Sequence, residues 1–218
     1  GAAINFGSKF VKTKYFIVSN PDVSGLDIIN LEIFQKFAVK LHDKFSVLGP
    51  RFVNTDPKSI TQSDVNKEIA EMRFLSGACM FFNKKNFDLL GGFDENIFLY
   101  FEENDFCKRS IKLYKNYQIN KIKVYHDAGN SVATKNSDEK NDHDNLRNWH
   151  FIWSKFYYFR KHYSYIIAII IFIPIILRTI FRINFYKLKN DNKNVIKYKT
   201  RFSGLISSIL KKKSFKRI

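Results

Sequence analysis

Hydrophobic and polar positions follow two different rhythms along the first 144 residues. Between residues 26 and 44, apolar side chains recur at the three- and four-residue spacing of one helix face. Short apolar runs bounded by turn residues predict strands instead. These are Tyr15–Ser19, Ser46–Pro50 with a turn at its end, Phe74–Phe82 with a break at Ser76–Ala78, and Gln118–Tyr125. The alternation of strands and helices predicts an α/β sheet whose polar residues gather at strand ends.

Two further helices are expected in this region. Residues 84–90 form the first, which ends at Gly91 and Gly92 because glycine readily adopts the backbone conformation that follows a helix. Residues 102–115 form the second, with acidic side chains at its start and basic ones later, as the helix dipole favours. The polar stretches 54–68 and 136–145 are predicted to be loops or linkers.

A different pattern begins after residue 145. Aromatic side chains crowd residues 149–159, and residues 163–177 carry no charge. A membrane-spanning helix needs about 20 apolar residues, whereas 10–14 indicate a buried or interfacial helix, so this run is intermediate. Arg178 and Arg182 follow it, and residues 203–213 are predicted to form a second, short amphipathic helix before a Lys-rich end.

Charge separates the two regions further. The 218 residues carry 37 Lys and Arg against 20 Asp and Glu, a net charge of +17. Residues 1–144 contribute +1 and residues 145–218 contribute +16. Positive charge segregated beside an apolar run, without a recognition motif, argues against nucleic-acid binding and favours an anionic membrane surface. We therefore predict a globular domain at 1–144 and a membrane-associated helical, basic region at 145–218.

Three placements of residues 163–181 are compatible with the sequence. The favoured one is a helix in the cytoplasmic leaflet, where neighbouring Trp and Tyr side chains suit the headgroup level. A true span and a helix buried in a protein core are the alternatives. Because positive charge flanks both ends of the run, the positive-inside rule assigns no orientation. The expected location is the cytoplasmic face of the cell membrane.

Three acidic or histidine sites follow apolar, strand-like segments. Asp22 follows the first predicted strand, Glu102–Asp105 follows Phe98–Phe101, and His126 follows the last predicted strand. Open α/β sheets bind ligands beyond the carboxyl ends of their strands, so we expect these sites at one edge. Asp and His suit a divalent cation such as Mg²⁺ or Mn²⁺, and a carboxylate at a helix start suits a general base.

Each of these sites also has an ordinary structural interpretation. An Asn-Pro-Asp sequence after a strand commonly forms a turn or a helix cap. Acidic residues that open a helix commonly serve its dipole, and a single His after a strand is commonly structural. The order of the motifs along the chain therefore carries more information than any one of them.

Six motifs stand in order: residues 1–7 (Gly-Ala-Ala-Ile-Asn-Phe-Gly), 20–22 (Asn-Pro-Asp), 76–80 (Ser-Gly-Ala-Cys-Met), 91–95 (Gly-Gly-Phe-Asp-Glu), 98–107 (Phe-Leu-Tyr-Phe-Glu-Glu-Asn-Asp-Phe-Cys) and 126–131 (His-Asp-Ala-Gly-Asn-Ser). Together they resemble family 2 glycosyltransferases, most closely the rhamnosyltransferase-like and galactofuranosyltransferase-like branch. The resemblance implies a GT-A fold with a mixed sheet and flanking helices. It also implies inverting transfer of a sugar from a nucleotide-diphosphate donor to a glycan or lipid-linked acceptor in cell-surface polysaccharide synthesis.

The resemblance assigns roles to individual residues. Glu103 matches the catalytic base, with Glu102 and Asp105 beside it, although family members usually carry Asp at that position. Asp22 matches the metal-binding Asp, and His126 matches a His that joins it on Mg²⁺ or Mn²⁺. The residues implied to contact donor or acceptor are Asn20, Ser76, Gly77, Ala78, Gly92 and Asp94.

In the family pattern, about two strand–helix units precede the motif found at residues 1–7. They supply the first strand and an Asp that contacts the nucleotide, so the resemblance implies a domain that is incomplete at its N-terminal side. The alternative function is a catalytically dead fragment or pseudoenzyme that acts only as a membrane-binding module.

Overall fold

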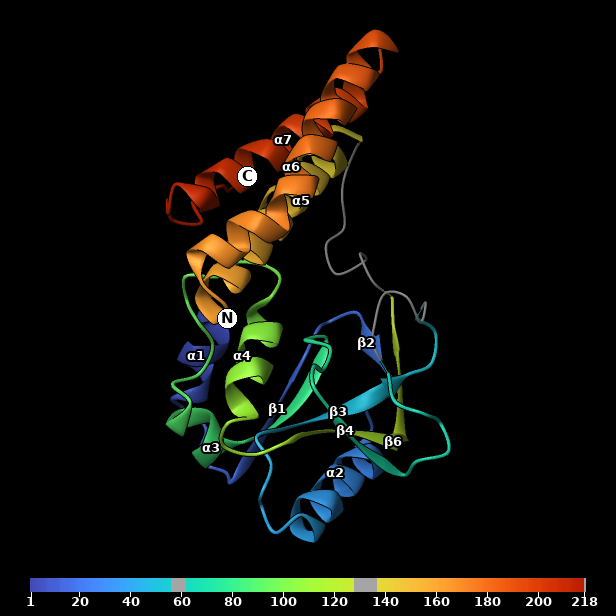
Figure 1. Ribbon diagram of the computed structural model, residues 1–218. Helices are drawn as coiled ribbons and strands as arrows, with labels where there is room; N and C mark the ends of the chain where they lie inside the picture. The colour runs from blue at the N-terminus through green and yellow to red at the C-terminus, as the bar shows by residue number, and fades with distance from the viewer. Residues whose placement is uncertain (56–61, 128–136, 218) are drawn as a thin grey trace. The chain divides into compact units, whose positions relative to one another are not determined.

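The computed structural model describes residues 1–55, 62–127 and 137–217. The chain forms two compact units (Figure 1). The sheet unit comprises Gly1–Asp94 and Glu102–Ala133, and the helical unit comprises Glu95–Phe101 and Thr134–Ile218. The units divide at residue 134 instead of the expected 144, and the short segment 95–101, expected within the globular domain, belongs to the helical unit.

Six strands form one mixed sheet among the described residues. In spatial order they are β1 (Tyr15–Ser19), β5 (Cys79–Asn83), β3 (Val47–Phe52), β6 (Asn116–His126) and β2 (Val23–Ser24), and β4 (Ile69–Met72) also pairs with β6. Only β3 and β6 pair in parallel among these strands. Because β5 is antiparallel to both β1 and β3, the strands β1, β3 and β6 run in one direction. Their carboxyl ends therefore meet at one edge of the sheet.

Helices cover both faces of this sheet. Helix α2 (Ile28–Lys40) packs Phe34 into a cluster that includes Phe81 of β5. Helices α3 (Lys84–Leu89) and α4 (Glu102–Ser110) place Phe87 and Phe106 in a second cluster with Phe82. Successive strand residues point to opposite faces, so Phe81 and Phe82 put the two clusters on opposite sides of β5. The predicted α/β class, with a mixed sheet and flanking helices, is confirmed.

Several element boundaries differ from expectation. Gly49 and Pro50 lie inside β3 instead of in a turn, at a register shift against β6 where a missing proline N–H is tolerated. The strand expected from Phe74 begins only at Cys79, and helix α4 ends at Ser110 instead of residue 115. Helix α1 (Ala2–Ser8) opens the chain. Of the loop expected at 54–68, residues 56–61 lie outside the described residues.

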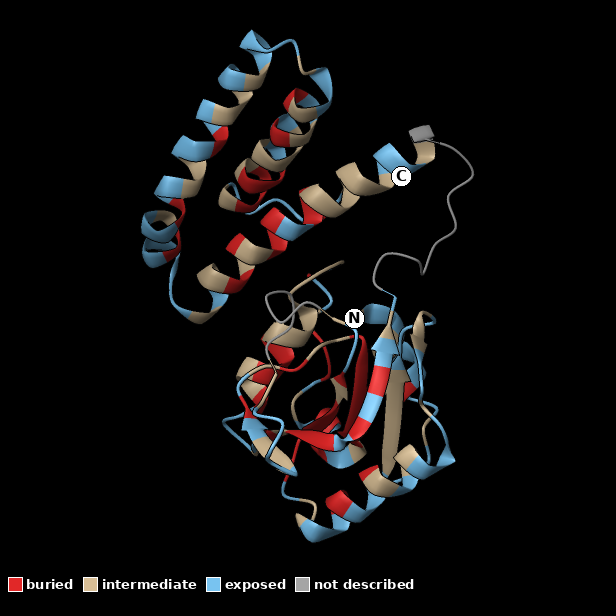
Figure 2. Ribbon diagram, turned by 90° about the vertical axis from the view of Figure 1, so that its right-hand side faces the viewer, coloured by how far each residue is buried: buried red, intermediate tan, exposed pale blue. Residues whose placement is uncertain are grey.

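The helical unit contains three long helices, α5 (Ser137–His162), α6 (Tyr165–Leu188) and α7 (Asn192–Ile209). Their common core includes Phe156 of α5, Ala168 and Phe172 of α6, and Leu205 of α7. The loop expected at 136–145 is wrong, because α5 is helical from Ser137; residue 136 itself lies outside the described part. The short helix expected at 203–213 is the end of the longer α7. Figure 2 shows α6 mostly exposed or intermediate, with few buried positions.

Candidate active site

Asp22 and His126 lie side by side at the edge where β1 and β6 end. Strand β2 pairs Val23 with His126, and the amide of Asp127 donates to the Asp22 carbonyl at 3.0 Å. The Asp22 Oδ1 atom is 3.4 Å from His126 Nε2, and the two side chains are 6% and 14% exposed. Two residues far apart in the sequence therefore form one buried carboxylate–imidazole pair, as their positions after strands predicted.

This pair has the character of an incomplete ligand set. Within the described residues, buried Asp22 Oδ1 and His126 Nδ1 make no hydrogen bond. Buried polar atoms are normally hydrogen-bonded, so both atoms are open to a water or a ligand, and the His126 nitrogen that faces Asp22 is Nε2. A carboxylate oxygen and an imidazole nitrogen suit Mg²⁺ or Mn²⁺. No group of three or more His, Cys, Asp or Glu side chains in ligand geometry occurs in the part of the chain that the structure describes. A cation held by Asp22 and His126 would therefore take its remaining ligands from substrate or water.

Asn54 supports His126 and was not identified from the sequence. Its Oδ1 accepts a hydrogen bond from the His126 amide at 2.8 Å, and its Nδ2 donates to the Asp127 carboxylate at 3.4 Å. Asn54 follows β3, the strand parallel to β6, so it emerges at the same edge. The sequence signal for Asn54 is a polar residue just beyond a predicted strand. This residue falls within residues 54–68, which are predicted only to be a loop.

Glu103 lies against Gly77. A Cβ atom added at Gly77 would be 3.3 Å from Glu103 Cβ and 3.4 Å from its Cγ. The resemblance implies that Gly77 contacts donor or acceptor, whereas the group packed against it in the structure is the Glu103 side chain. The side chain that approaches Gly77 is the proposed base, and no claim about a substrate contact follows from this packing.

A backbone hydrogen bond joins the two motifs that flank these side chains. The Asn20 amide donates to the Ala78 carbonyl at 2.8 Å, directly beyond the paired residues Ser19 and Cys79. The Ala78 amide in turn donates to the Ser76 hydroxyl at 3.3 Å. Residues 20–22 and 76–78 thus leave neighbouring strands β1 and β5 at the same edge of the sheet.

The environment of Glu103 changes its acidity. Loss of hydration, the larger cause, and the negative charge of Glu102 together raise the pKa of Glu103 to about 8. Burial also raises the pKa of Glu102. A carboxyl group that titrates near neutral pH, and that keeps some accessible surface, is well matched to proton transfer.

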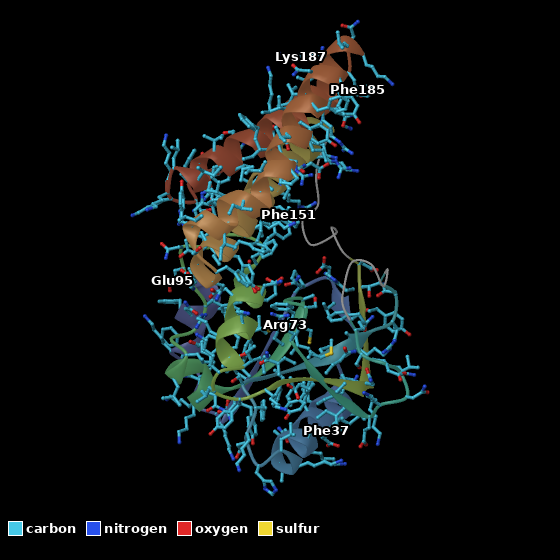
Figure 3. The ribbon with its side chains drawn as sticks, viewed as in Figure 1. Phe37, Arg73, Glu95, Phe151, Phe185 and Lys187 are labelled. Atoms are coloured by element: carbon cyan, nitrogen blue, oxygen red, sulfur yellow. The ribbon has the colours of Figure 1, made fainter. Side chains whose placement is uncertain are left out.

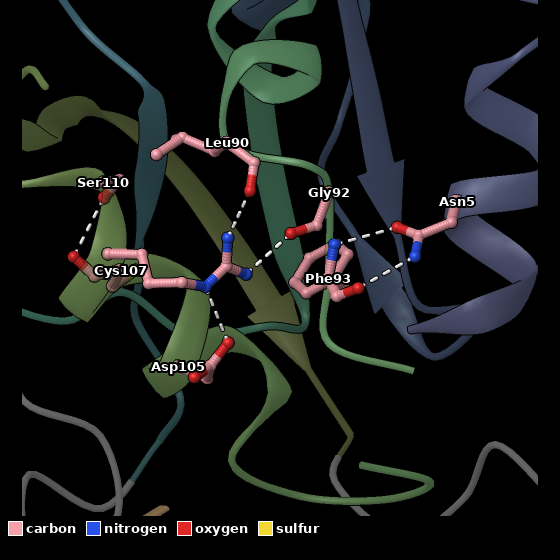
Figure 4. Close-up of polar contacts among 8 residues, drawn as sticks. Asn5, Leu90, Gly92, Phe93, Asp105, Cys107 and Ser110 are labelled. Carbon is pink, nitrogen blue, oxygen red and sulfur yellow. Dashed lines mark hydrogen bonds and ion pairs between the residues drawn. The ribbon is translucent and has the colours of Figure 1, made fainter. Parts of the chain in front are cut away.

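Asp105 forms an ion pair within its own helix. Its buried carboxylate accepts a 2.9 Å bond from Arg109 Nε (Figure 4). The same guanidinium donates to the carbonyls of Leu90 and Gly92, each at 2.6 Å. Asp105 therefore orients Arg109, which fastens the end of α3. This contact gives Asp105 a structural role, and the catalytic role implied for it stays a prediction.

Gly92 belongs to the same structural cluster. It has a positive φ of 67°, and a Cβ there would lie 2.5 Å from Asn5 Oδ1. The Asn5 side chain makes two hydrogen bonds with Phe93, the residue after Gly92. It accepts from the Phe93 amide at 2.8 Å and donates to the Phe93 carbonyl at 2.9 Å. Gly92 thus shapes a turn, and half-buried Asp94 follows it. A substrate contact by either remains a prediction.

The residues just before α4 are held in a strained conformation. Tyr100 and Phe101 have φ angles of 65° and 70°, which are unusual for bulky side chains. Their rings pack against Phe151 of α5, with centroids 5.7 Å away in both cases. Ser154 of α5 also donates to the Leu99 carbonyl at 2.8 Å. Phe98–Phe101 is therefore a loop fastened within the helical unit, and the expectation of a strand-like segment is wrong. The residue that follows it is Glu102.

Comparison of this chain with protein-family models and with curated proteins finds no match in either set. The glycosyltransferase resemblance therefore rests on the sequence motifs alone.

Proposed function

We propose that the sheet unit is the C-terminal portion of a family 2 glycosyltransferase domain with a GT-A fold. Its reaction is the inverting transfer of a sugar from a nucleotide-diphosphate donor to a glycan or lipid-linked acceptor in cell-surface polysaccharide synthesis. The observation that carries the proposal is the 3.4 Å approach of Asp22 to His126. The resemblance assigns these two residues to one metal site, although almost half the chain separates them.

Glu103 is the proposed general base. In its deprotonated form it accepts the proton of an acceptor hydroxyl while that oxygen attacks the anomeric carbon. Attack opposite the leaving diphosphate inverts the anomeric centre, so no covalent intermediate on the enzyme is needed. Loss of hydration and the neighbouring Glu102 favour protonation of Glu103. Its carboxylate is consequently a stronger base than that of an ordinary glutamate.

Asp22 and His126 are the proposed ligands of Mg²⁺ or Mn²⁺. The bound cation supplies positive charge that stabilises a departing diphosphate. Asn54 keeps the His126 backbone in place through its 2.8 Å hydrogen bond. Asn20 and Ser76–Ala78, which adjoin β1 and β5 at the same edge of the sheet, are proposed to contact the donor or the acceptor.

The helical unit is proposed to hold the enzyme at the cytoplasmic face of the cell membrane. Residues 145–218 carry a net charge of +16, which anionic lipid attracts by about 1 kcal/mol for each basic residue near the surface. A lipid-linked acceptor is confined to that surface, so attachment brings enzyme and acceptor together.

The test is sugar transfer by the complete protein from labelled nucleotide-sugars to membranes in the presence of Mn²⁺. Asp22→Ala should lower the metal-dependent rate by at least about 100-fold. Asp88→Ala, which removes only an exposed ion pair with Lys84, is the matched control and should transfer sugar normally. Equal rates for wild type and Asp22→Ala would refute the metal role.

The second candidate is a non-catalytic membrane-binding protein. It is favoured by the lack of a third protein ligand beside Asp22 and His126 within the described residues. The two candidates differ in nucleotide binding. The enzyme requires Mn²⁺-dependent binding of a nucleoside diphosphate that Asp22→Ala abolishes, and the membrane-binding module shows none.

A further inference from the structure

Helix α6 presents a largely apolar face, interrupted by exposed Asn184, that no described residue covers. Ile166, Leu177 and Leu188 are 71%, 63% and 86% exposed. They are spaced eleven residues apart, about three helical turns, so they lie along one line of the helix. The remaining large apolar side chains exposed on α6 are Tyr165, Ile167, Ile170, Ile171, Ile173, Ile180, Phe181 and Phe185. Figure 3 labels Phe185 and Lys187 near the end of this helix.

Length and composition alone would allow α6 to cross a bilayer. Among the described helices it is the one that passes this criterion. From Ile166 to Leu188 the helix rises about 33 Å, close to the roughly 30 Å of a hydrocarbon core. The residues packed against α6 therefore decide whether this helix spans the membrane or lies in its plane.

The opposite side of α6 packs against basic helices. Phe172 contacts Phe156 of α5 with ring centroids 5.1 Å apart, and Tyr186 stacks on Tyr198 of α7 at 5.6 Å. The guanidinium group of Arg182 on α6 donates a hydrogen bond to the Tyr198 hydroxyl. Burial lowers the pKa of Arg201 on α7, and the nearby positive charges of Arg182 and Arg178 lower it further. Three guanidinium groups thus gather along the second half of α6.

A spanning α6 would take these groups into the hydrocarbon. Each arginine at the centre of a bilayer costs about 2.5–3.5 kcal/mol on insertion scales, and α6 cannot separate from α7 without losing the packed core of the unit. An orientation in the membrane plane avoids this cost. The exposed face then enters the acyl boundary, while the helices packed on the other side remain at headgroup level or in water.

We propose that α6 lies in the plane of an anionic membrane leaflet, inserted through the face that contains Ile166, Leu177 and Leu188, and does not span the bilayer. The inference rests on the membrane association proposed above and specifies its geometry. Charge complementarity identifies the occupant of this face as lipid. A unit with a net charge of +16 over residues 145–218 repels a second copy of itself but attracts acidic headgroups. Exposed Lys211, Lys212 and Lys213, just beyond α7, add to that attraction.

The experiment measures the depth of three positions on the face. Single cysteines at Ile166, Leu177 and Leu188 carry a fluorophore, and vesicles of phosphatidylcholine and phosphatidylglycerol contain lipids brominated at different depths. These positions are exposed, whereas the native Cys79 and Cys107 are buried. The in-plane helix predicts the same shallow depth at all three, about 5–10 Å below the headgroups. A cysteine at Ile29, an exposed residue of α2 in the sheet unit, should show no quenching.

A second pair of variants tests the face by binding. Leu177→Glu should reduce vesicle flotation at least tenfold, whereas Ile29→Glu places the same charge at an equally exposed isoleucine of α2 and should float normally. A depth profile with Leu177 at the bilayer centre and both ends shallow would overturn the in-plane geometry but leave membrane association intact. A chain that floats with none of the three positions quenched would refute the assigned face. A chain that never floats, or that forms a dimer broken by Leu177→Glu, would refute membrane association itself. None of these results depends on sugar transfer, so catalytic failure is distinguishable.

Discussion

The sheet unit and the helical unit are both rich in large apolar side chains, but they place them in opposite ways. In the sheet unit, Phe34, Phe82 and Phe106 are fully buried on the two faces of the sheet. In the helical unit, α6 buries Ala168 and Phe172 but exposes a line of isoleucine and leucine side chains. Residues 1–144 are nearly neutral, whereas residues 145–218 carry almost the whole net charge.

This difference shows what each arrangement can support. Packing in the sheet unit removes most of the water around Glu103, which raises the pKa of its carboxyl group toward the range needed for the proposed proton transfer. Incomplete burial in the helical unit leaves a face that water solvates poorly, beside charges that acidic lipid attracts. This contrast agrees with the proposed chemistry in the sheet unit and the proposed membrane attachment through the helical unit.

Disrupting a contact between helices of the helical unit should lower the stability of that unit and leave the sheet unit unchanged. This is the largest stability effect that we expect. A Cβ at Gly204 of α7 would lie 2.5 Å from the Trp149 carbonyl of α5, so Gly204→Ala must force these helices apart. We expect the helical unit to lose about 3 kcal/mol of unfolding free energy. Hydrogen–deuterium exchange, resolved by peptide, measures this loss of stability in each unit.

Gly7→Ala is the control for this experiment. It adds a methyl group where nothing lies within 4 Å, so it should slightly stabilise α1. Equal loss of amide protection in both units of Gly204→Ala would contradict their separate stability.

Substitutions in the loop before α4 should change the unfolding free energy by a smaller amount. Phe101→Ala removes ring contacts to Phe151 and Tyr158 but keeps the positive φ, so it should cost about 2 kcal/mol. Phe101→Gly removes the same contacts and relieves the backbone strain, so it should cost about 1 kcal/mol less. Denaturant unfolding of the two variants gives the difference. A glycine variant no more stable than the alanine variant would show that the conformation is unstrained.

The smallest effect is expected inside the candidate site. Gly77→Ala places a methyl group 3.3 Å from Glu103 Cβ, which must then move by a few tenths of an ångström. We expect a loss of about 1 kcal/mol in transition-state stabilisation, or about fivefold in turnover. Turnover equal to wild type would mean that the position of Glu103 is not critical.

Local patterns predicted the strand ends well. A short apolar run followed by Asn-Pro-Asp, and another followed by His, were sufficient to place Asp22 and His126 at one edge. The pair of glycines after residue 90 marked the end of α3, and both do adopt positive φ. In each case the sequence signal lies within a few residues of the strand end or helix end that it marks.

Long-range packing decided the rest. Phe98–Phe101 has the composition of a strand, but its rings are fastened by α5, about fifty residues later. The polar start of α5 was interpreted as a linker because its buried stripe begins only near Trp149. The role of Asp105 depended on Arg109 and on the carbonyls of Leu90 and Gly92, which no spacing in the sequence reveals.

The proposed removal of the acceptor proton by Glu103 is tested most directly by the pH dependence of sugar transfer. Because the pKa of Glu103 is raised to about 8, the base is protonated at lower pH, so the wild-type rate should rise through pH 8 and then level off. Glu103→Gln should lower the rate by about 10²- to 10⁴-fold and abolish this rise, whereas Glu103→Asp should retain it. A Glu103→Gln enzyme with the rate and pH profile of wild type would contradict the account.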